Sequence, residues 1–138
     1  MTEFEFKCCP VGRVESSLVS RADAPRQGDE GAPAAWLVFD GAVAEGLAGL
    51  TAGMEMIVLT WLDRARRDVL TVHPRGDTRN PACGVFLTRS PDRPNPIGLH
   101  RVTVTAVDGL RVQVRNLEAL DGTPVLDVKP LLGPVSER

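Results

Sequence analysis

The stretch Arg101–Arg115, RVTVTAVDGLRVQVR, decides the fold class of this chain. Apolar and polar residues alternate on both sides of the pair Asp108-Gly109. Alternation with a period of two is typical of a half-buried strand, and Asp-Gly between two such runs is the strongest short-range signal of a β-hairpin. The sequence therefore predicts a hairpin that turns at Asp108-Gly109, with both turn residues at positive φ.

Short apolar runs outside this hairpin predict further strands. We expect them over Phe4–Cys8 with a continuation over Val11–Leu18, and over Ala34–Phe39, Met54–Leu62, Val69–Val72, Val85–Thr88 and Val125–Val128. The spacing of Val43, Leu47 and Leu50 predicts one short helix over Val43–Leu50, and Arg21–Pro33 is expected to be a loop. Strands dominate, and closing a sheet removes its exposed edges. The sequence therefore predicts a mainly β fold, a single-domain antiparallel β-barrel with short helical segments over residues 1–138.

Composition narrows the class of protein further. The chain has 138 residues, enough for one core, and its 43% hydrophobic and 25% charged residues exclude a disordered chain. It lacks a run of about 18 apolar residues and the basic start of a signal peptide, so we expect a cytoplasmic protein that does not enter a membrane. An odd number of cysteines without a Cys-x-x-Cys pair favours neither disulfides nor a metal site. Cys8, Cys9 and Cys83 are expected to be small buried thiols.

The net charge of −2 is unevenly distributed along the chain. Residues 1–63 carry four basic and ten acidic groups, residues 64–101 carry eight Arg and three Asp, and residues 102–138 carry four basic and five acidic groups. The middle segment is therefore a basic island. Such an island attracts phosphates or carboxylates, although a solvated surface rich in Arg explains the charge equally well.

A proline-stiffened loop lies inside this island. Pro91, Pro94 and Pro96 each fix φ and restrict the preceding residue. Arg89, Ser90, Arg93 and Asn95, all with directional hydrogen-bonding groups, are interspersed with these prolines. A rigid loop with several donors suits a carboxylate or phosphate site, whereas the alternative is a tight connection whose Arg side chains face water. The density of polar groups favours the site.

Two other segments combine turns with charge. Leu120–Pro130, LDGTPVLDVKP, contains a turn signature at Asp121 and an acidic residue, Asp127, inside an apolar strand. Burying Asp127 is costly unless it is paired, so it either takes part in a site, pairs with an Arg or faces water. His73–Asp77 is either a substrate-binding turn or an exposed loop.

Two of these segments resemble the signatures of a known family. Gly84–Leu99, GVFLTRSPDRPNPIGL, and Leu120–Pro130 closely resemble the two motifs of the TrmO family, also called TsaA-like or VirR-like proteins. Weaker similarity at Pro10–Gly12, Pro25–Gln27 and Pro74–Gly76 extends the match over nearly the whole chain. The resemblance implies a β-barrel enzyme that works as a homodimer and binds S-adenosylmethionine near the subunit interface. It also implies methylation of the exocyclic nitrogen of threonylcarbamoyl-adenosine, beside the tRNA anticodon.

The resemblance also implies site residues. The cofactor-binding candidates are Gln27, Leu87, Thr88, Arg89, Ser90, Arg93, Asn95, Asp121, Gly122, Thr123 and Val125. Arg89 would hold the cofactor's carboxylate, Asp121 would accept from its ribose or amino group, and backbone groups near Leu87 and Val125 would pair with its adenine edge. The substrate-binding candidates are Arg64, Arg75 and Asp77, and Asp127 or His100 would take the acceptor's proton. No metal is expected.

Several features keep other functions open. Many bacterial relatives carry a further C-terminal domain, which this chain is expected to lack. With 4% aromatic residues and no Tyr, bases could stack only on Trp36, Trp61 or Phe86, which are expected in the core. The alternatives are a small-molecule methyltransferase and a non-catalytic module that binds the cofactor. The positions of five arginines distinguish RNA from a small substrate: Arg64, Arg66, Arg67, Arg75 and Arg79. If these arginines share one face beside a pocket, RNA is favoured. If they are scattered over the surface, a small substrate is favoured.

Overall fold

The computed structural model describes residues 4–134, so both ends of the expected 1–138 domain, residues 1–3 and 135–138, lie outside that range. Six strands form one antiparallel sheet in the order β1-β2-β7-β6-β3-β8, and β8 also pairs with β1, which closes the barrel. The mainly β prediction is confirmed. The strands of this sheet are β1 (Gly12–Glu15), β2 (Ala35–Phe39), β3 (Glu55–Trp61), β6 (Ile97–Asp108), β7 (Arg111–Arg115) and β8 (Pro124–Pro130).

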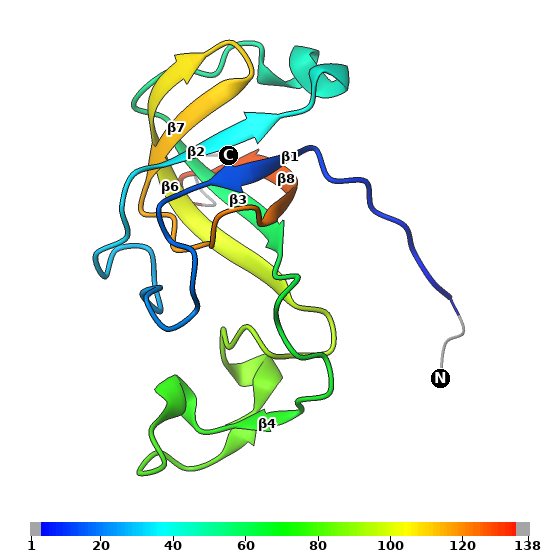
Figure 1. The fold of residues 1–138 in the computed structure, drawn as a ribbon, viewed down its shortest axis with the longest axis vertical. Coiled ribbons are helices and arrows are strands. Elements are labelled where there is room, and N and C mark those ends of the chain that lie inside the picture. The colour runs from blue at the N-terminus through cyan, green and yellow to red at the C-terminus, as the bar shows by residue number, and fades with distance from the viewer. Residues whose placement is uncertain (1–3, 135–138) are drawn as a thin grey trace.

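A smaller lobe, residues 66–95, lies beyond one end of the barrel (Figure 1). It contains β4 (Thr71–Val72) and β5 (Cys83–Gly84), which pair with each other and with no other strand of the described chain. It also contains two short 3-10 helices, η2 (Pro74–Gly76) and η3 (Val85–Leu87). The lobe follows β3 and precedes β6, so two neighbouring strands of the barrel carry it.

The hairpin that the sequence predicts joins β6 to β7, but its turn lies one residue later than expected. Asp108 pairs with Arg111, so the turn residues are Gly109 and Leu110. Of these only Gly109 has a positive φ, +60°. Glycine at the first central position suits a type II′ turn, in which the second position needs no left-handed backbone. The expectation of positive φ at Asp108 is therefore wrong.

The barrel interior changes from apolar to polar toward the lobe. Val102 and Val104 on β6 are buried among valines and leucines of the neighbouring strands. The same inward row continues toward the lobe through His100, 4% exposed, to Gly98, and Thr60 on β3 is fully buried beside them. Buried polar groups need partners, so this end of the barrel must be organised by hydrogen bonds as well as by packing.

The strand expected over Phe4–Cys8 is wrong. Residues 4–10 form no strand and run away from the barrel (Figure 1). Phe4 and Phe6 are 78% and 89% exposed. Alternation makes a strand only beside a free sheet edge, and β1 already pairs with β2 and β8 on its two sides. The expectation of buried thiols is also wrong, since Cys8 and Cys9 are exposed and Cys83, on β5 of the lobe, is half-buried.

Two further elements differ in type from their predictions. The helix expected over Val43–Leu50 is a 3-10 helix, η1 (Gly41–Leu47), whose N-terminal Ala42 N–H donates to the Asp40 carboxylate at 2.9 Å. It ends before Gly49, which has a φ of +87°. Val85–Thr88 is expected to be a strand, but its backbone turns within η3. None of the helices in residues 4–134 has the length and apolar character to cross a membrane.

Candidate functional site

A cavity of about 790 Å³ opens where the polar end of the barrel meets the lobe. Its volume falls within the range of small-molecule and cofactor sites. The walls come from the β1–β2 loop (residues 16–34), the segment after β3, the lobe, the inner end of β6 and the β7–β8 connection. The residues that line it include Arg21, Pro25, Arg26, Gln27, Asp63, Arg64, Pro74, Arg75, Leu87, Thr88, Arg89, Ser90, His100, Glu118, Leu120 and Thr123.

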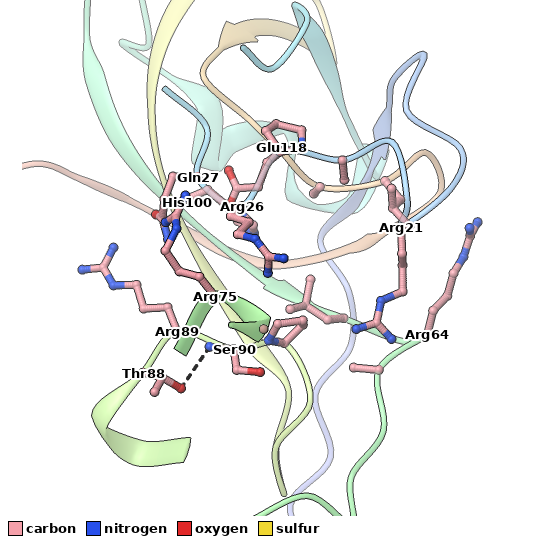
Figure 2. Close-up of a pocket in the computed structure, with 18 of the residues that line it drawn as sticks. Arg21, Arg26, Gln27, Arg64, Arg75, Thr88, Arg89, Ser90, His100 and Glu118 are labelled. Carbon is pink, nitrogen blue, oxygen red and sulfur yellow. Dashed lines mark hydrogen bonds and ion pairs between the residues drawn. The ribbon is translucent and has the colours of Figure 1, made fainter. Parts of the chain in front are cut away.

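The cavity brings together five arginines against two carboxylates. Arg21 and Arg64 approach from one side, and Arg75 and Arg89 from the other (Figure 2). Two of the five arginines are salt-bridged, because Arg21 lies 3.2 Å from the Asp92 carboxylate and Arg75 lies 2.8 Å from that of Glu30. A third, Arg64, donates to the carbonyl oxygen of Val19 at 2.8 Å and, more weakly, to that of Asp121.

Arg26 and Arg89 differ from the other three. Within residues 4–134, neither guanidinium makes an ion pair or a hydrogen bond. Both side chains line the cavity, one from the β1–β2 loop and one from the lobe. A guanidinium offers a rigid fork of donors that matches a carboxylate or a phosphate. The cavity therefore presents two cationic groups that are free to bind an anionic ligand.

Two salt bridges clamp the β1–β2 loop to the lobe, Arg21–Asp92 and Arg75–Glu30. Burial alone would raise the pKa of Asp92, but hydrogen bonds from the Arg66 backbone N–H and from Arg21 outweigh it and hold that pKa below its ordinary value. A carboxylate with a lowered pKa stabilises the fold above its unfolded-state pKa, and this contribution is lost as pH falls through the folded-state value.

Arg93 holds the proline-stiffened loop in shape and does not line the cavity. Its guanidinium donates to the carbonyl oxygens of Val85, Thr88 and Ser90 at 2.9–3.0 Å. The Thr88 hydroxyl accepts from the Ser90 N–H at 3.2 Å, which tightens the same turn (Figure 2). Arg93 therefore acts on any ligand through the backbone that carries Arg89.

We expect Arg93→Lys to weaken ligand binding at the cavity and to destabilise the protein by about 1–3 kcal/mol, because an ammonium group cannot reach three carbonyls in a fixed fork. Urea unfolding measures the stability change, and calorimetry with S-adenosylmethionine measures binding. Arg101→Lys is the matched control, since within residues 4–134 the Arg101 side chain makes a single ion pair, with Glu55, and is exposed. Equal stability of the two variants would contradict this role for Arg93.

Asn95 belongs to the same scaffold and is also absent from the cavity lining. Its side-chain oxygen accepts from Arg67 at 2.9 Å, and Arg67 also donates to the Pro94 carbonyl at 2.7 Å. The guanidinium of Arg67 lies over the Trp61 ring, 5.2 Å from its centre. These contacts join the lobe to the end of β3.

The second motif divides in a similar way. Asp121 accepts from the Ser16 N–H at 3.0 Å through its carboxylate, so its side chain fixes the turn to the segment after β1. Gly122 has a φ of +82°, and its N–H donates to the Val14 carbonyl. Asp121 and Gly122 line a separate shallow groove, whereas Thr123 is buried and lines the cavity. Val125, fully buried in the barrel core, does not line it.

The two candidates for the proton acceptor lie in different places. Asp127 is outside the cavity, half-exposed on β8, where it accepts from the Val128 N–H and pairs with Lys129 at 3.0 Å. His100 lines the cavity. Its Nδ1 lies 2.6 Å from the Glu118 carboxylate and its Nε2 lies 2.7 Å from the Thr60 hydroxyl.

The basic island does not form one free face. Arg64 and Arg75 line the cavity, whereas Arg66, Arg67 and Arg79 do not and bind other groups of the lobe. Arg66 pairs with Asp68 and Arg79 pairs with Asp77. The hydrogen bond from Arg79 lowers the pKa of Asp77, so this predicted substrate contact is a partner of Arg79 outside the cavity.

Among the charged residues of the cavity wall, sequence reasoning missed Arg21, Arg26, Asp63 and Glu118. Arg26 stands in a Pro-Arg-Gln run with weak family similarity, which is the only signal that singled it out. Glu118 lies between the buried residues Leu117 and Ala119, where an acidic residue is unusual. The expectation that Phe86 is a core residue is wrong, because it is 79% exposed on the lobe. Trp36 and Trp61 are half-buried.

In the described part of the chain, no three His, Cys, Asp or Glu side chains cluster as metal ligands would.

Comparison with known proteins identifies the family. The model of the tRNA-methyltransferase O N-terminal domain matches residues 13–135. An S-adenosyl-L-methionine-binding protein of Archaeoglobus fulgidus is 45% identical over 120 residues, which cover 87% of this chain and 85% of that protein. A probable S-adenosyl-L-methionine-binding protein, VirR of Rhizobium radiobacter, is 41% identical over 87% of this chain and 67% of its own.

Solved structures agree with this result. A crystal structure of TrmO from Pseudomonas aeruginosa superposes with a TM-score of 0.76 at 26% identity, over 99% of this chain and 61% of that one. A second TrmO crystal structure gives a TM-score of 0.75 at 29% identity, over 94% of this chain and 58% of the other. The chain thus spans about three fifths of these solved proteins. The sequence motifs, the fold and these matches together establish that the chain belongs to the family of tRNA-methyltransferase O N-terminal domains.

Proposed function

We propose that this protein is an S-adenosylmethionine-dependent methyltransferase whose acceptor is the exocyclic nitrogen of threonylcarbamoyl-adenosine in tRNA. The observation that carries the proposal is the pair of unpartnered guanidinium groups, Arg26 and Arg89, on the wall of one cavity. The cofactor carries one carboxylate on its amino-acid tail, and the threonyl group of the acceptor carries another. Two anionic groups in one reaction complex call for two free cations, one for each.

The cavity wall also suits the rest of the cofactor. Arg89 is the candidate for its carboxylate, because it is carried by the loop that Arg93 holds rigid. Asp63, a carboxylate on the cavity wall, supplies negative charge for the positively charged part of the cofactor. Leu87, an exposed residue of the cavity lining, offers its backbone groups for the edge of a base. When bound, S-adenosylmethionine would supply an electrophilic methyl group, so no covalent enzyme residue is required.

Family membership supports this proposal, because the matching model describes a tRNA-methyltransferase domain and the curated relatives are described as S-adenosylmethionine-binding. We propose in addition that residues 1–138 act as one domain, that two copies form a homodimer, and that the protein acts in the cytoplasm where tRNA is modified. Exposed apolar residues on the lobe, Leu70, Phe86 and Leu87, support a partner subunit. Sedimentation equilibrium of the full chain tests the dimer.

One observation favours a second candidate. Arg66 and Arg79 pair with neighbouring carboxylates, so fewer cations are free for RNA phosphates than the charge of the island implies. A small-molecule methyltransferase with the same cofactor pocket fits this pattern. The cavity itself is equally suited to a small acceptor with a carboxylate.

A methyl-transfer assay separates the two candidates. We expect S-adenosylmethionine to bind in calorimetry, and the methyl-labelled cofactor to transfer label to tRNA that carries threonylcarbamoyl-adenosine but not to the same tRNA without it. Binding without transfer to either tRNA would favour the small-molecule acceptor. No binding of the cofactor to the wild-type protein would rule out the methyltransferase reading altogether.

A further inference from the structure

The cavity wall contains a buried chain of three polar side chains. Thr60 is fully buried and His100 is almost so, and the third member, Glu118, is 17% exposed in its side chain. The Thr60 hydroxyl lies 2.7 Å from His100 Nε2, and His100 Nδ1 lies 2.6 Å from Glu118 Oε1. The chain therefore runs from the barrel interior to the cavity and ends at a carboxylate.

The available hydrogen-bond partners determine where the protons lie in the Thr60–His100–Glu118 series. Within residues 4–134, the Thr60 side chain has His100 Nε2 as its sole hydrogen-bond partner, so its buried hydroxyl satisfies its proton by donating to that nitrogen. His100 Nε2 is then an acceptor, and Nδ1 carries the ring proton. Nδ1–H donates to Glu118 Oε1, which makes Glu118 the ionised acceptor at the end of the chain.

The second oxygen of Glu118 is left for a ligand. In the described chain Oε2 accepts no hydrogen bond, and it lies beside Gly28. A Cβ placed on Gly28 would stand 2.9 Å from this oxygen, so only glycine fits beside the Glu118 carboxylate here. Glu118 thus lines the cavity with one oxygen fixed by His100 and a second oxygen that accepts no hydrogen bond within residues 4–134.

We propose that Glu118 accepts the proton that the methyl acceptor loses, and that His100, supported by Thr60, positions its carboxylate for this step. The inference rests on the proposed methyl transfer. In that reaction the acceptor nitrogen forms a bond to the methyl carbon, and the carbon–sulfur bond breaks with its electrons remaining on sulfur. The N–H proton that the nitrogen must release passes to Glu118, so atoms and charge balance.

The other titratable groups of the cavity suit this role less well. Asp63 is the other carboxylate of the cavity lining, but it is exposed, and within residues 4–134 no hydrogen bond orients its side chain. His100 has both ring nitrogens engaged, so it can act on the acceptor only through Glu118. A general base must reach the proton that it takes, and of the carboxylates that line the cavity in residues 4–134 it is Glu118 that a hydrogen bond holds in place.

Single-turnover methyl transfer at saturating S-adenosylmethionine, with tRNA that carries threonylcarbamoyl-adenosine, tests the role of Glu118. We expect Glu118→Gln to reduce the rate by about 10²–10⁴-fold, the usual range for losing a general base, and to leave cofactor affinity within about threefold. Glu118→Asp should restore part of the rate. Glu55→Gln is the matched control, because Glu55 is an exposed carboxylate outside the cavity.

The pH dependence of this rate identifies the step. The wild-type rate should rise with pH as the base loses its proton, and Glu118→Gln should abolish that rise. The charged groups that line the same cavity, and that could add their own pH dependence, are Arg21, Arg26, Asp63, Arg64, Arg75 and Arg89. Asp63 is the other carboxylate in this lining, so Asp63→Asn is measured alongside and should retain the rise.

An independent readout does not need activity. Nitrogen-15 NMR of the wild-type protein without ligand should show the His100 ring protonated at Nδ1, and Glu118→Gln should alter this resonance. His100→Asn should slow methyl transfer about tenfold while retaining a pH-dependent rise, as a positioning residue would.

The outcomes separate the two proposals. If the wild-type protein transfers no methyl group, the proposed function fails while the NMR result still tests the hydrogen-bonded chain. If the wild type is active but Glu118→Gln keeps its rate within about threefold, or loses only cofactor affinity, the role of Glu118 is overturned.

Discussion

Replacing Gly28 with alanine is expected to destabilise the protein by about 1–3 kcal/mol and to lower its melting temperature by roughly 5–10 °C. Gly28 lies in the β1–β2 loop against the backbone of Asn116, and a Cβ there would overlap with the Asn116 carbonyl group. The obstacle is backbone, which cannot rotate away as a side chain can. Asn116 itself has a φ of +69°, so the connection that carries Glu118 is already constrained.

The same substitution should also impair ligand binding, because Arg26 and Gln27 immediately precede Gly28 on the cavity wall. Thermal unfolding measures stability, and calorimetry with S-adenosylmethionine measures affinity. Gly46→Ala is the matched control, since a Cβ at Gly46 meets nothing within 4 Å. If the Gly28→Ala protein has the melting temperature and the cofactor affinity of the wild type, the loop can move away from Asn116 without loss of stability, and this prediction is wrong.

Arg89→Ala should weaken the binding of S-adenosylmethionine by about 10–100-fold, with little change in stability. The guanidinium of Arg89 makes no hydrogen bond or ion pair within residues 4–134, so its removal breaks no contact in the fold. A charge-assisted hydrogen bond to a carboxylate is worth about 1.5–3 kcal/mol, and the exposure of Arg89 favours the lower end.

Titration calorimetry of both proteins at two salt concentrations measures this effect, and the difference between them should shrink as salt screens the charge. Arg115→Ala is the control, because Arg115 is an exposed arginine that is absent from the cavity lining. Unchanged affinity in Arg89→Ala would assign the carboxylate of the cofactor to another group, with Arg26 the first to test.

The fold could be predicted where its determinants are local. The β6–β7 hairpin needs only alternation and a turn within fifteen residues, and it forms as expected apart from the shift of one residue at Gly109. The closure of the barrel has no such local signal, since β1 meets β8 more than a hundred residues later. The alternation of Phe4 to Cys8 was misleading because a pattern does not reveal whether a sheet edge is free.

The site could be predicted as a region but not as a set of roles. Arg89 and Arg93 stand four residues apart in one motif, yet one points to the cavity and the other binds three carbonyls. Which arginine does which depends on the path of the backbone through η3, which the sequence pattern misassigned as a strand. Glu118 was missed because its partner His100 lies 18 positions away in the sequence, and folding of the barrel brings the two side chains together.

The two salt bridges between the β1–β2 loop and the lobe make the width of the cavity sensitive to salt. Both pairs, Arg21–Asp92 and Arg75–Glu30, are open to solvent and therefore screened by dissolved salt. Raising the ionic strength therefore has two effects on the cavity. It weakens the attraction for an anionic ligand, and it weakens the two salt bridges that hold the β1–β2 loop against the lobe. Arg26 belongs to the β1–β2 loop and Arg89 to the lobe, the two segments that these salt bridges join. A ligand that binds both arginines would itself link the loop to the lobe. The distance between the loop and the lobe should therefore fluctuate more in the free protein than in the ligand-bound protein.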